Sequence, residues 1–506
     1  MLWLAVTCGM AGVAQTQARH EITLAELRDK IAGGWAGQMI GVSFGAPTEF
    51  RALGRIFEDP LPPWKPERVK NSLDQDDLYV DMTLARVLDE KGLEATTQDF
   101  AAAFARTQYR LWHANLAARR NLHRGIPAAL AGHPRYNAHA NDIDFQIEAD
   151  FIGLMAPGLF RATNRIAQRA GRVMNYGDGI YGGMFVSGMY AAAFFEKDPA
   201  RIVEAGLACI PPRSRYARLL ADVLAWRRQY PDDWRRVWRL IEDKWDANDP
   251  CPAGALRPFN IDAKLNGAYI ALGLLYGNGD FGRTIEIATR AGQDSDCNPA
   301  SAGGILGVVL GYQGIPEIWK SGIPAIAEEK FRYTDYSFHS IVESTLKRAI
   351  ALVEREGGRR LGERLIVPVQ KPAPPKLETW DFGRVAERIP ADDPRWQFRG
   401  PWRVEKNQRL ASEKGAEASI RFHGTGAIIV GPYLPAGGKA DIYLDGKLHR
   451  TVDVCSDETG SKGDEAVWHS YGLRNGEHTV RLVVRGEPFG ASGGTDVGVS
   501  ALVVFR

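Results

Sequence analysis

The hydrophobic pattern of this chain changes its period once, and that change limits the folds it can adopt. Across residues 22–355, apolar residues recur at the three- and four-residue spacing of amphipathic or fully buried helices. In the last part of the chain, apolar and polar residues instead alternate in short runs, as they do in half-buried strands. We therefore expect an all-α domain over 19–364 and an all-β sandwich over 391–506, joined by the proline-rich stretch 365–390 as a linker.

The composition excludes functions that need a strong charge bias or a membrane span. The 506 residues are 45% hydrophobic and 25% charged, with a formal net charge of +2, so nothing favours binding to nucleic acid or to an anionic membrane. Beyond the N-terminus no stretch reaches the ~20 apolar residues of a membrane span. A small molecule or a glycan is the expected substrate, and the basic runs 119–124 and 226–239 are interpreted as solvated helix faces. The sequence indicates no oligomeric state.

The first 18 residues resemble a secretory signal peptide. They are apolar for about a dozen residues and then small and polar, although basic residues are missing at the start. We expect residues 1–18 to be removed and the protein to be periplasmic or secreted; a buried first helix is the alternative. Export would permit a disulfide, with Cys209 and Cys251 as the candidate pair, whereas the cysteine spacing matches no zinc motif.

Two groups of aspartates stand at predicted helix starts, far apart in the chain. Asp76 and Asp77 begin one helix, and Asp294 and Asp296 precede another that is built of small residues. One acid is enough to cap a helix, which is worth about 0.5–2 kcal/mol, while neighbouring carboxylates repel each other unless they share a cation. The two clusters therefore favour a hard divalent cation such as Mg²⁺, Mn²⁺ or Ca²⁺ over zinc. Capping alone is the alternative.

A glycine-rich helix precedes both clusters. Glycines at 33, 37, 41 and 45 recur every four residues and leave one helix face bare, which permits close helix packing. The helix breaks at Pro47 and releases Glu49 into whatever lies beyond its end.

These three elements together resemble the ADP-ribosylglycohydrolase superfamily. The matching stretches are GVSFGAPTEF at 41–50, QDDLYVDMTLA at 75–85 and AGQDSDCNPASAGGILG at 291–307. The resemblance spans about residues 20–330 and implies an all-α fold with two Mg²⁺ ions in a central cleft. It further implies that Asp76, Asp77, Asp294 and Asp296 are metal ligands and that Glu49, Asp77 and Asp294 are catalytic.

The chain departs from the family pattern at four positions. Gln75 and Cys297 replace metal-binding threonines, Leu78 replaces a further threonine, and Val42 replaces an aspartate. The amide oxygen of Gln75 can still coordinate a cation, but a thiol such as Cys297 is a poor ligand for Mg²⁺. Both stay candidate ligands, and one of the two sites is expected to be altered or to hold Ca²⁺ or Mn²⁺.

Further side chains are candidates for lining the cleft and binding substrate. Glu148 lies four residues after Asp144 and is expected to share its helix face, with Asp150 close behind; a solvated face is the alternative. Tyr176 and Gly177 belong to a glycine-rich loop that could hold a sugar or serve only as a turn. Asn298 is a candidate donor to a substrate hydroxyl. The histidines at 113, 123 and 139 are interpreted as structural.

The C-terminal part resembles the small, jelly-roll-like sandwich modules that are appended to secreted glycoside hydrolases. Two hairpin signals, Asp445-Gly446 and Asn475-Gly476, separate its alternating runs. Such modules bind carbohydrate through exposed aromatic residues, and the candidates here are Tyr433, Trp468, His469 and Tyr471. Packing against the sandwich core or the helical domain is the equally weighted alternative.

Together these features predict an exported, metal-dependent glycosidase that hydrolyses an N- or O-glycosidic bond at a ribosyl or furanosyl anomeric carbon. The alternative is a non-catalytic protein that binds metal and carbohydrate on the same scaffold. A structural protein with acidic helix caps is the third reading.

Overall fold

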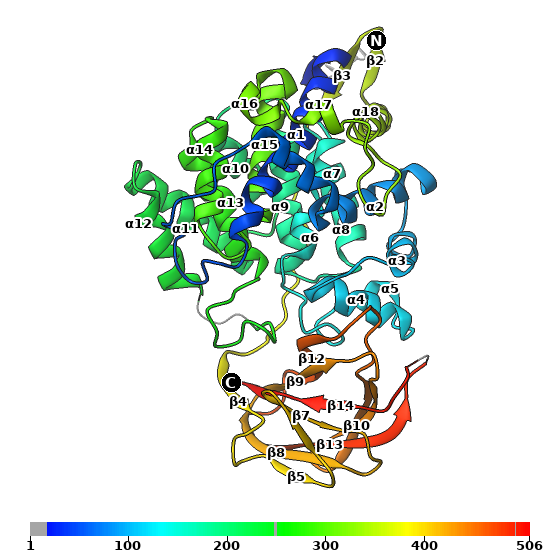
Figure 1. The fold of residues 1–506 in the computed structure, drawn as a ribbon. Coiled ribbons are helices and arrows are strands. Elements are labelled where there is room, and N and C mark those ends of the chain that lie inside the picture. Colours follow the sequence, from blue (N-terminus) through cyan, green and yellow to red (C-terminus); the bar gives the residue numbers. More distant parts are fainter. Residues whose placement is uncertain (1–17, 247–249, 491) are drawn as a thin grey trace, which may run out of the picture.

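The computed structural model describes residues 18–246, 250–490 and 492–506 and divides the chain into a helical body and a β-sandwich (Figure 1). The predicted fold class is therefore confirmed. Residues 1–17 of the predicted signal peptide lie outside the described residues. Within the described part of the chain, no helix is both long and apolar enough to cross a lipid bilayer.

The helical body is built around long buried helices with shorter ones at its periphery. Its principal helices are α1 (Leu24–Gly45), α2 (Asp76–Lys91), α3 (Thr97–Ala105), α4 (His113–His123), α8 (Phe160–Gly171), α9 (Asp178–Ala193), α10 (Pro199–Ala208), α11 (Arg215–Gln229), α12 (Trp234–Ile241), α13 (Ala263–Gly277), α14 (Phe281–Arg290), α15 (Cys297–Gly314) and α18 (Phe338–Arg355). The short ones are α5 (Ala128–Ala131), α6 (Asp144–Ile147), α7 (Asp150–Leu154), α16 (Glu317–Lys320) and α17 (Ile323–Ile326), with η1 (Ala46–Thr48), η2 (Pro66–Asp74) and η3 (Glu242–Asp246).

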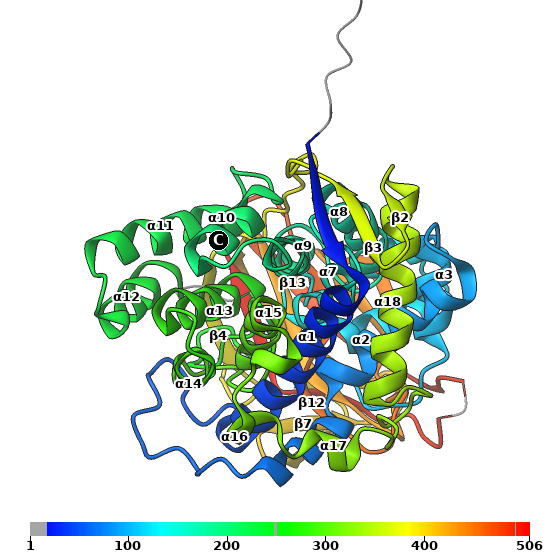
Figure 2. The same ribbon diagram turned by 90° about the horizontal axis from the view of Figure 1, so that it is seen from above.

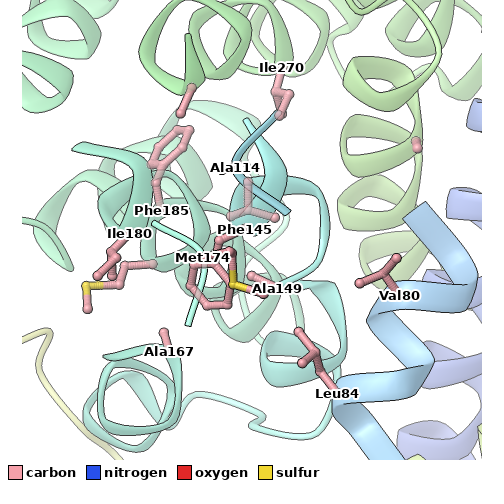
Figure 3. Packing of buried hydrophobic residues seen from close by; sticks show 14 of the residues in the cluster. Val80, Leu84, Ala114, Phe145, Ala149, Ala167, Met174, Ile180, Phe185 and Ile270 are labelled. Carbon is pink, nitrogen blue, oxygen red and sulfur yellow. The ribbon is translucent and has the colours of Figure 1, made fainter. Parts of the chain in front are cut away.

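The predicted central helix is α9, which is apolar all round and buried along its length from Gly179 onward. Ile180 and Phe185 on this helix pack among Phe145, Met174 and Ala167 in the core (Figure 3). A helix without a polar face has no solvent side, so its neighbours must surround it. It forms part of the rigid frame behind the acidic residues of α2 and α7.

The bare face of α1 packs directly against the backbone of α15. A Cβ atom added to Gly33, Gly37 or Gly41 would lie 2.1–2.2 Å from a carbonyl oxygen of the α15 segment, and one on Gly45 would lie 2.0 Å from that of Ser295. The two helices run antiparallel, side by side in both views (Figure 1 and Figure 2). This packing places the end of α1 beside the start of α15.

A small sheet also belongs to the helical body. β1 (Arg19–Thr23) pairs antiparallel with β3 (Arg364–Pro368), which pairs with β2 (Arg359–Leu361). The segment 365–390 that was expected as a linker thus begins in one strand and ends in another, β4 (Val385–Pro390), which belongs to the sandwich.

Antiparallel sheets form the sandwich. One has the strand order β11-β10-β13-β8-β5, a second β12-β9-β15-β4, and a third β14-β7-β6. The strands are β5 (Gln397–Arg399), β6 (Arg403–Glu405), β7 (Gln408–Ala411), β8 (Glu417–Gly424), β9 (Gly426–Tyr433), β10 (Gly438–Leu444), β11 (Lys447–Asp453), β12 (Lys462–Ser470), β13 (Gly476–Pro488), β14 (Val497–Val499) and β15 (Ala501–Phe505). Asp445 and Gly446, the predicted hairpin signal, connect β10 to β11, both with positive φ.

The sandwich docks on α4 (Figure 1), where Arg119 and Arg120 of the basic run 119–124 are buried and Arg124 is half-buried. The Arg119 guanidinium contacts Glu458 at 2.5 Å, and Arg124 pairs with Asp453 at 2.7 Å and Asp457 at 2.9 Å. The interpretation of this run as a solvated face was wrong, because its partner acids come from the end of β11 and the loop after it, more than 300 positions away.

The aromatic candidates of the sandwich face this interface or the core. Trp468 is buried and donates to His449 at 2.9 Å, and His469 is buried against the carbonyl of Pro134 at 2.9 Å. Tyr433 is buried with the Arg120 guanidinium 3.6 Å from its ring centre. Tyr471 packs edge-on against Phe505. These positions fit the packing alternative and offer no exposed aromatic platform.

Within the described residues, Cys209, Cys297 and Cys455 are free cysteines. Cys209 lies in the core and contacts the Ala205 carbonyl, while Cys251 lies in a different region beside His139. The proposed disulfide between Cys209 and Cys251 is therefore absent from the structure.

Candidate metal-binding active site

Glu49 is held at the start of α15 by the turn that follows α1. The hydroxyl oxygens of Thr48 and Ser295 are 2.9 Å apart, and the Phe50 amide donates to the Gln293 carbonyl at 3.1 Å. The glycine-lined contact between the two helices makes this turn possible, because any side chain on that face would push them apart.

The two aspartate clusters meet at this end of the helices. Oxygen atoms of Glu49, Asp294 and Asp296 lie within 4.8 Å of one another, and the same holds for ligand atoms of Asp77, Asp296 and Cys297. Asp296 belongs to both groups. Residues 220 positions apart in the chain, Asp77 and Cys297, are thus in direct contact, with the thiol 3.3 Å from an Asp77 oxygen.

Many of the carboxylate oxygens around this point lack a hydrogen-bond partner. Asp77, Asp81, Glu148, Asp150 and Asp294 are buried, and one oxygen of each is buried without a partner within the described residues. Leaving a buried acceptor unpaired costs about 1–3 kcal/mol. Of these five, Asp77 and Asp294 belong to the two groups that share Asp296, so a divalent cation held there would supply their missing partners.

The raised pKa values of the clustered acids also favour a bound cation. Burial, followed by the charges of neighbouring acids, raises the pKa of Asp77 and of Asp296 well above the usual value, and burial with the charges of Glu49 and Asp77 raises the pKa of Asp294 to about 8. Glu49 is exposed at the mouth of the site, yet partial desolvation and the charges of Asp296 and Asp76 raise its pKa to about 8. These carboxyl groups can ionise together only when a positive charge joins them.

Asp76, Gln75 and Cys297 border this group. Asp76 is half-buried at the first position of α2, and Gln75 is the N-cap residue, whose side chain makes no capping bond. The Cys297 thiol is 3.7 Å from an Asp296 oxygen as well as in contact with Asp77. Asp74 is separate from the cluster: it binds Arg332 at 2.7 Å on the surface.

The acids from Asp144 to Asp150 lie on two short helices, α6 and α7, and Glu148 is the C-cap residue of α6. Asp144 and Glu148 point to the same place, as the spacing predicted, because Asp144 accepts from the Asn115 backbone amide and Glu148 from the Asn115 side chain. Both acids are buried, so the solvated-face alternative is wrong. Asp150 accepts from Gln38 at 2.9 Å. The charge of Asp150 acts on both Asp77 and Asp81, which places it near the cluster.

The remaining substrate-binding candidates divide between two places. Asn298 is buried on α15, where its amide donates to Asn266 at 2.9 Å and its own oxygen lacks a partner. Tyr176 and Gly177 line a different cavity of about 280 Å³, together with Trp380 and Arg213. Gly177 has a φ of +53° at the start of α9, as a turn requires.

Sequence reasoning missed Gln38, Asn115 and the contribution of the sandwich. Gln38 is a lone polar residue within the apolar stretch of α1, and that isolation was a usable signal. Lys462 comes from β12 of the sandwich, and its charge acts on Asp76. No local pattern could have predicted that contribution, because it depends on how the two domains dock.

Comparison with known proteins identifies the scaffold. A profile of the ADP-ribosylglycohydrolase family matches residues 23–354. The chain belongs to the ADP-ribosylglycohydrolase family. The resemblance seen in the three sequence motifs is therefore confirmed for the family. A solved ADP-ribosylglycohydrolase-related protein complex is similar at 16% identity with a TM-score of 0.43, covering 64% of this chain and 98% of that one.

Two further proteins are similar to shorter stretches of this chain. A curated relative, the A type blood alpha-D-galactosamine galactosaminidase of Flavonifractor plautii, is 29% identical over 106 residues, which are 20% of this chain. The matched part spans about a tenth of that relative's length. A carbohydrate-binding module solved with calcium and xylotriose is similar at 9% identity and a TM-score of 0.17, covering 24% of this chain and 100% of the module.

Proposed function

We propose that this protein is an exported, divalent-metal-dependent glycosidase that cleaves an N- or O-glycosidic bond at a ribosyl or furanosyl anomeric carbon. The observation that carries the proposal is the convergence of Asp77, Asp294 and Asp296 with Glu49 at one point, with buried oxygens that lack partners. Family membership supports a glycosidase-type hydrolase on this scaffold.

Asp76, Asp77, Asp294 and Asp296 are the residues that would hold the cation, with Mg²⁺ as the first candidate and Mn²⁺ or Ca²⁺ as alternatives. A bound divalent cation supplies the positive charge that lets these carboxylates ionise together and that attracts the oxygens of a sugar. Cys297 occupies the position between Asp77 and Asp296, so the second of two cation positions is expected to be altered.

The exposure of each acidic residue indicates its proposed role in the reaction. Glu49 is exposed at the mouth of the site, so its carboxylate can accept the proton of a water whose oxygen bonds to the anomeric carbon, while the leaving group takes up a proton from solvent as the glycosidic bond breaks. Asp77 and Asp294 are buried beneath it and orient the reacting groups. Glu148, Asp150 and Asn298 lie in the surrounding wall and are proposed to position substrate hydroxyls.

The test is turnover of the purified protein against aryl furanosides, ADP-ribosylated protein, aryl α-galactosaminides and polysaccharides, each with and without EDTA. The galactosaminide is included because of the name of the curated relative. Hydrolysis of a furanosyl or ribosyl substrate that EDTA abolishes and Mg²⁺ restores is the expected result.

Asp294→Asn and Asp296→Asn should each lower turnover at least about 100-fold, a loss in the range seen when a positioned group is removed. Asp74→Asn is the matched control, because Asp74 is a nearby aspartate whose carboxylate is engaged by Arg332 on the surface. Tight cation binding without turnover of any substrate would favour the non-catalytic alternative.

A further inference from the structure

A second cluster of potential metal ligands lies outside the acidic site. His113 at the start of α4, His139 and Asp142 from the loop between α5 and α6, and Cys251 place one ligand atom each within 4.8 Å of all the others. The pairs with printed distances are His139 Nδ1 to Asp142 Oδ2 at 2.8 Å, Cys251 Sγ to His139 Nδ1 at 3.5 Å, and His113 Nδ1 to Asp142 Oδ2 at 3.6 Å.

We propose that these four side chains form a closed, structural site for one Zn²⁺ ion, independent of the acidic site. The donor set of one thiolate, two imidazoles and one carboxylate is the chemistry that zinc prefers, and it is unlike the all-oxygen set around Asp296. Four protein ligands would leave no open coordination position, which is typical of a structural and not a catalytic zinc.

The distances agree with this assignment. Zinc bonds of about 2.3 Å to sulfur and about 2.0–2.1 Å to nitrogen place tetrahedral neighbours roughly 3.3–3.6 Å apart. The Cys251–His139 and His113–Asp142 separations, 3.5 and 3.6 Å, are close to that range. The His139 Nδ1–Asp142 Oδ2 distance of 2.8 Å is shorter than that range, so these two atoms would move slightly apart when the ion binds.

The surroundings also suit a bound cation. His139, Asp142 and Cys251 are buried, and His113 is partly exposed to a cavity of about 240 Å³ through which an ion can reach the cluster. The buried Nε2 atom of His139 has no hydrogen-bond partner and points toward Glu465 of the sandwich, 3.8 Å away. Zinc-bound histidines commonly direct the second ring nitrogen at such a carboxylate.

The fold explains why this site is invisible in the sequence. His139 and Asp142 are near neighbours, but His113 and Cys251 come from distant segments, so no zinc motif arises. A bound ion would tie the segment containing Cys251 to the start of α4, directly beneath the docked β12 strand. The site would therefore stabilise the interface between helical body and sandwich.

Cobalt substitution tests the proposal on the full chain. The purified protein is stripped of metal and titrated with Co²⁺, which gives an intense thiolate charge-transfer absorption when a cysteine coordinates it. Cys251→Ser should lose this absorption and weaken Zn²⁺ binding at least about 100-fold, more than the typical loss from an outer-shell change. Cys209→Ser, at a buried and unpaired cysteine elsewhere, is the matched control.

Cys297→Ser separates the two sites, because Cys297 lies in the acidic cluster. The absorption should persist in Cys297→Ser and in Asp296→Asn, even where Asp296→Asn abolishes turnover. Absorption that is absent from the parent protein, or that only Cys297→Ser removes, would overturn the zinc assignment and leave the proposed glycosidase untouched. If Cys251→Ser does not fold, His113→Gln gives the same readout of Zn²⁺ affinity with the thiolate kept.

Discussion

Replacing Gly41 with alanine tests whether the α1–α15 contact positions the acidic site. The added Cβ would lie 2.1 Å from the carbonyl oxygen of Pro299, and both atoms belong to rigid helical segments. Because a Cβ atom essentially never lies within 3.0 Å of another heavy atom, the helices must part by roughly 1 Å near this position. Overpacking of this kind costs about 1–3 kcal/mol of folding free energy.

The consequence for function should be larger than for stability. Glu49 follows α1 and Asp296 precedes α15, so separating the helices moves one acid away from the other. A displacement of about 1 Å at a catalytic group can lower the rate on the order of 100-fold. Urea unfolding and turnover of the furanoside are measured for Gly41→Ala beside Gly314→Ala, a glycine at the exposed end of α15 whose nearest neighbour would be 3.3 Å away. Full activity and unchanged cation affinity in Gly41→Ala would show that the helix contact does not set the site.

Three further outcomes follow from particular contacts. Cys297→Thr restores an oxygen ligand between the acids and should increase Mg²⁺ affinity in calorimetric titration; unchanged binding would show that the thiol is not what alters the site. Arg119→Ala should destabilise the protein by about 1.5–3 kcal/mol, because it removes one charged partner of the buried Glu458 carboxylate, which keeps Lys462 and the Leu111 amide. In a double-mutant cycle Glu458→Ala should cost less when Arg119 is already absent. Burial lowers the pKa of His469 to about 3, so its stabilising contribution is complete above pH 6.5, where the unfolded state loses its proton, and declines as the pH falls toward 3. His469→Gln should therefore unfold with a shallower dependence on pH between 6.5 and 4, by up to about 1.4 kcal/mol per pH unit, and an unchanged slope would contradict the buried neutral imidazole.

Much of the fold could be predicted because its signals are local. Helical spacing over 22–355 and alternation after the linker each depend on neighbouring residues, and the glycine repeat of α1 predicted the close helix packing that the structure contains. Local signals failed where contacts with distant residues interrupt a helix. The acids from Asp144 to Asp150 fit one helix by spacing, but the chain bends at Glu148, which is buried beside Asn115.

The contacts between the helical body and the sandwich could not be predicted from local sequence patterns. The basic run of α4 has the composition of a solvated helix, and its acidic partners Asp453 and Glu458 come from the end of β11 and the loop that follows it. The same limit applies to the cluster around Cys251, whose ligands come from three separate segments. The acidic site could be proposed from sequence because each of its halves is a compact motif at a helix start.

The most direct test of the acidic site is a crystal of the full chain soaked in MnCl₂ and measured for anomalous scattering of manganese. The geometry predicts a strong anomalous peak within coordination distance of the Asp77, Asp294 and Asp296 carboxylates, with the peak lost from crystals of Asp296→Asn. Manganese bound only at surface carboxylates, with the buried acids protonated and bonded to one another, would contradict the proposal that these residues hold a divalent cation.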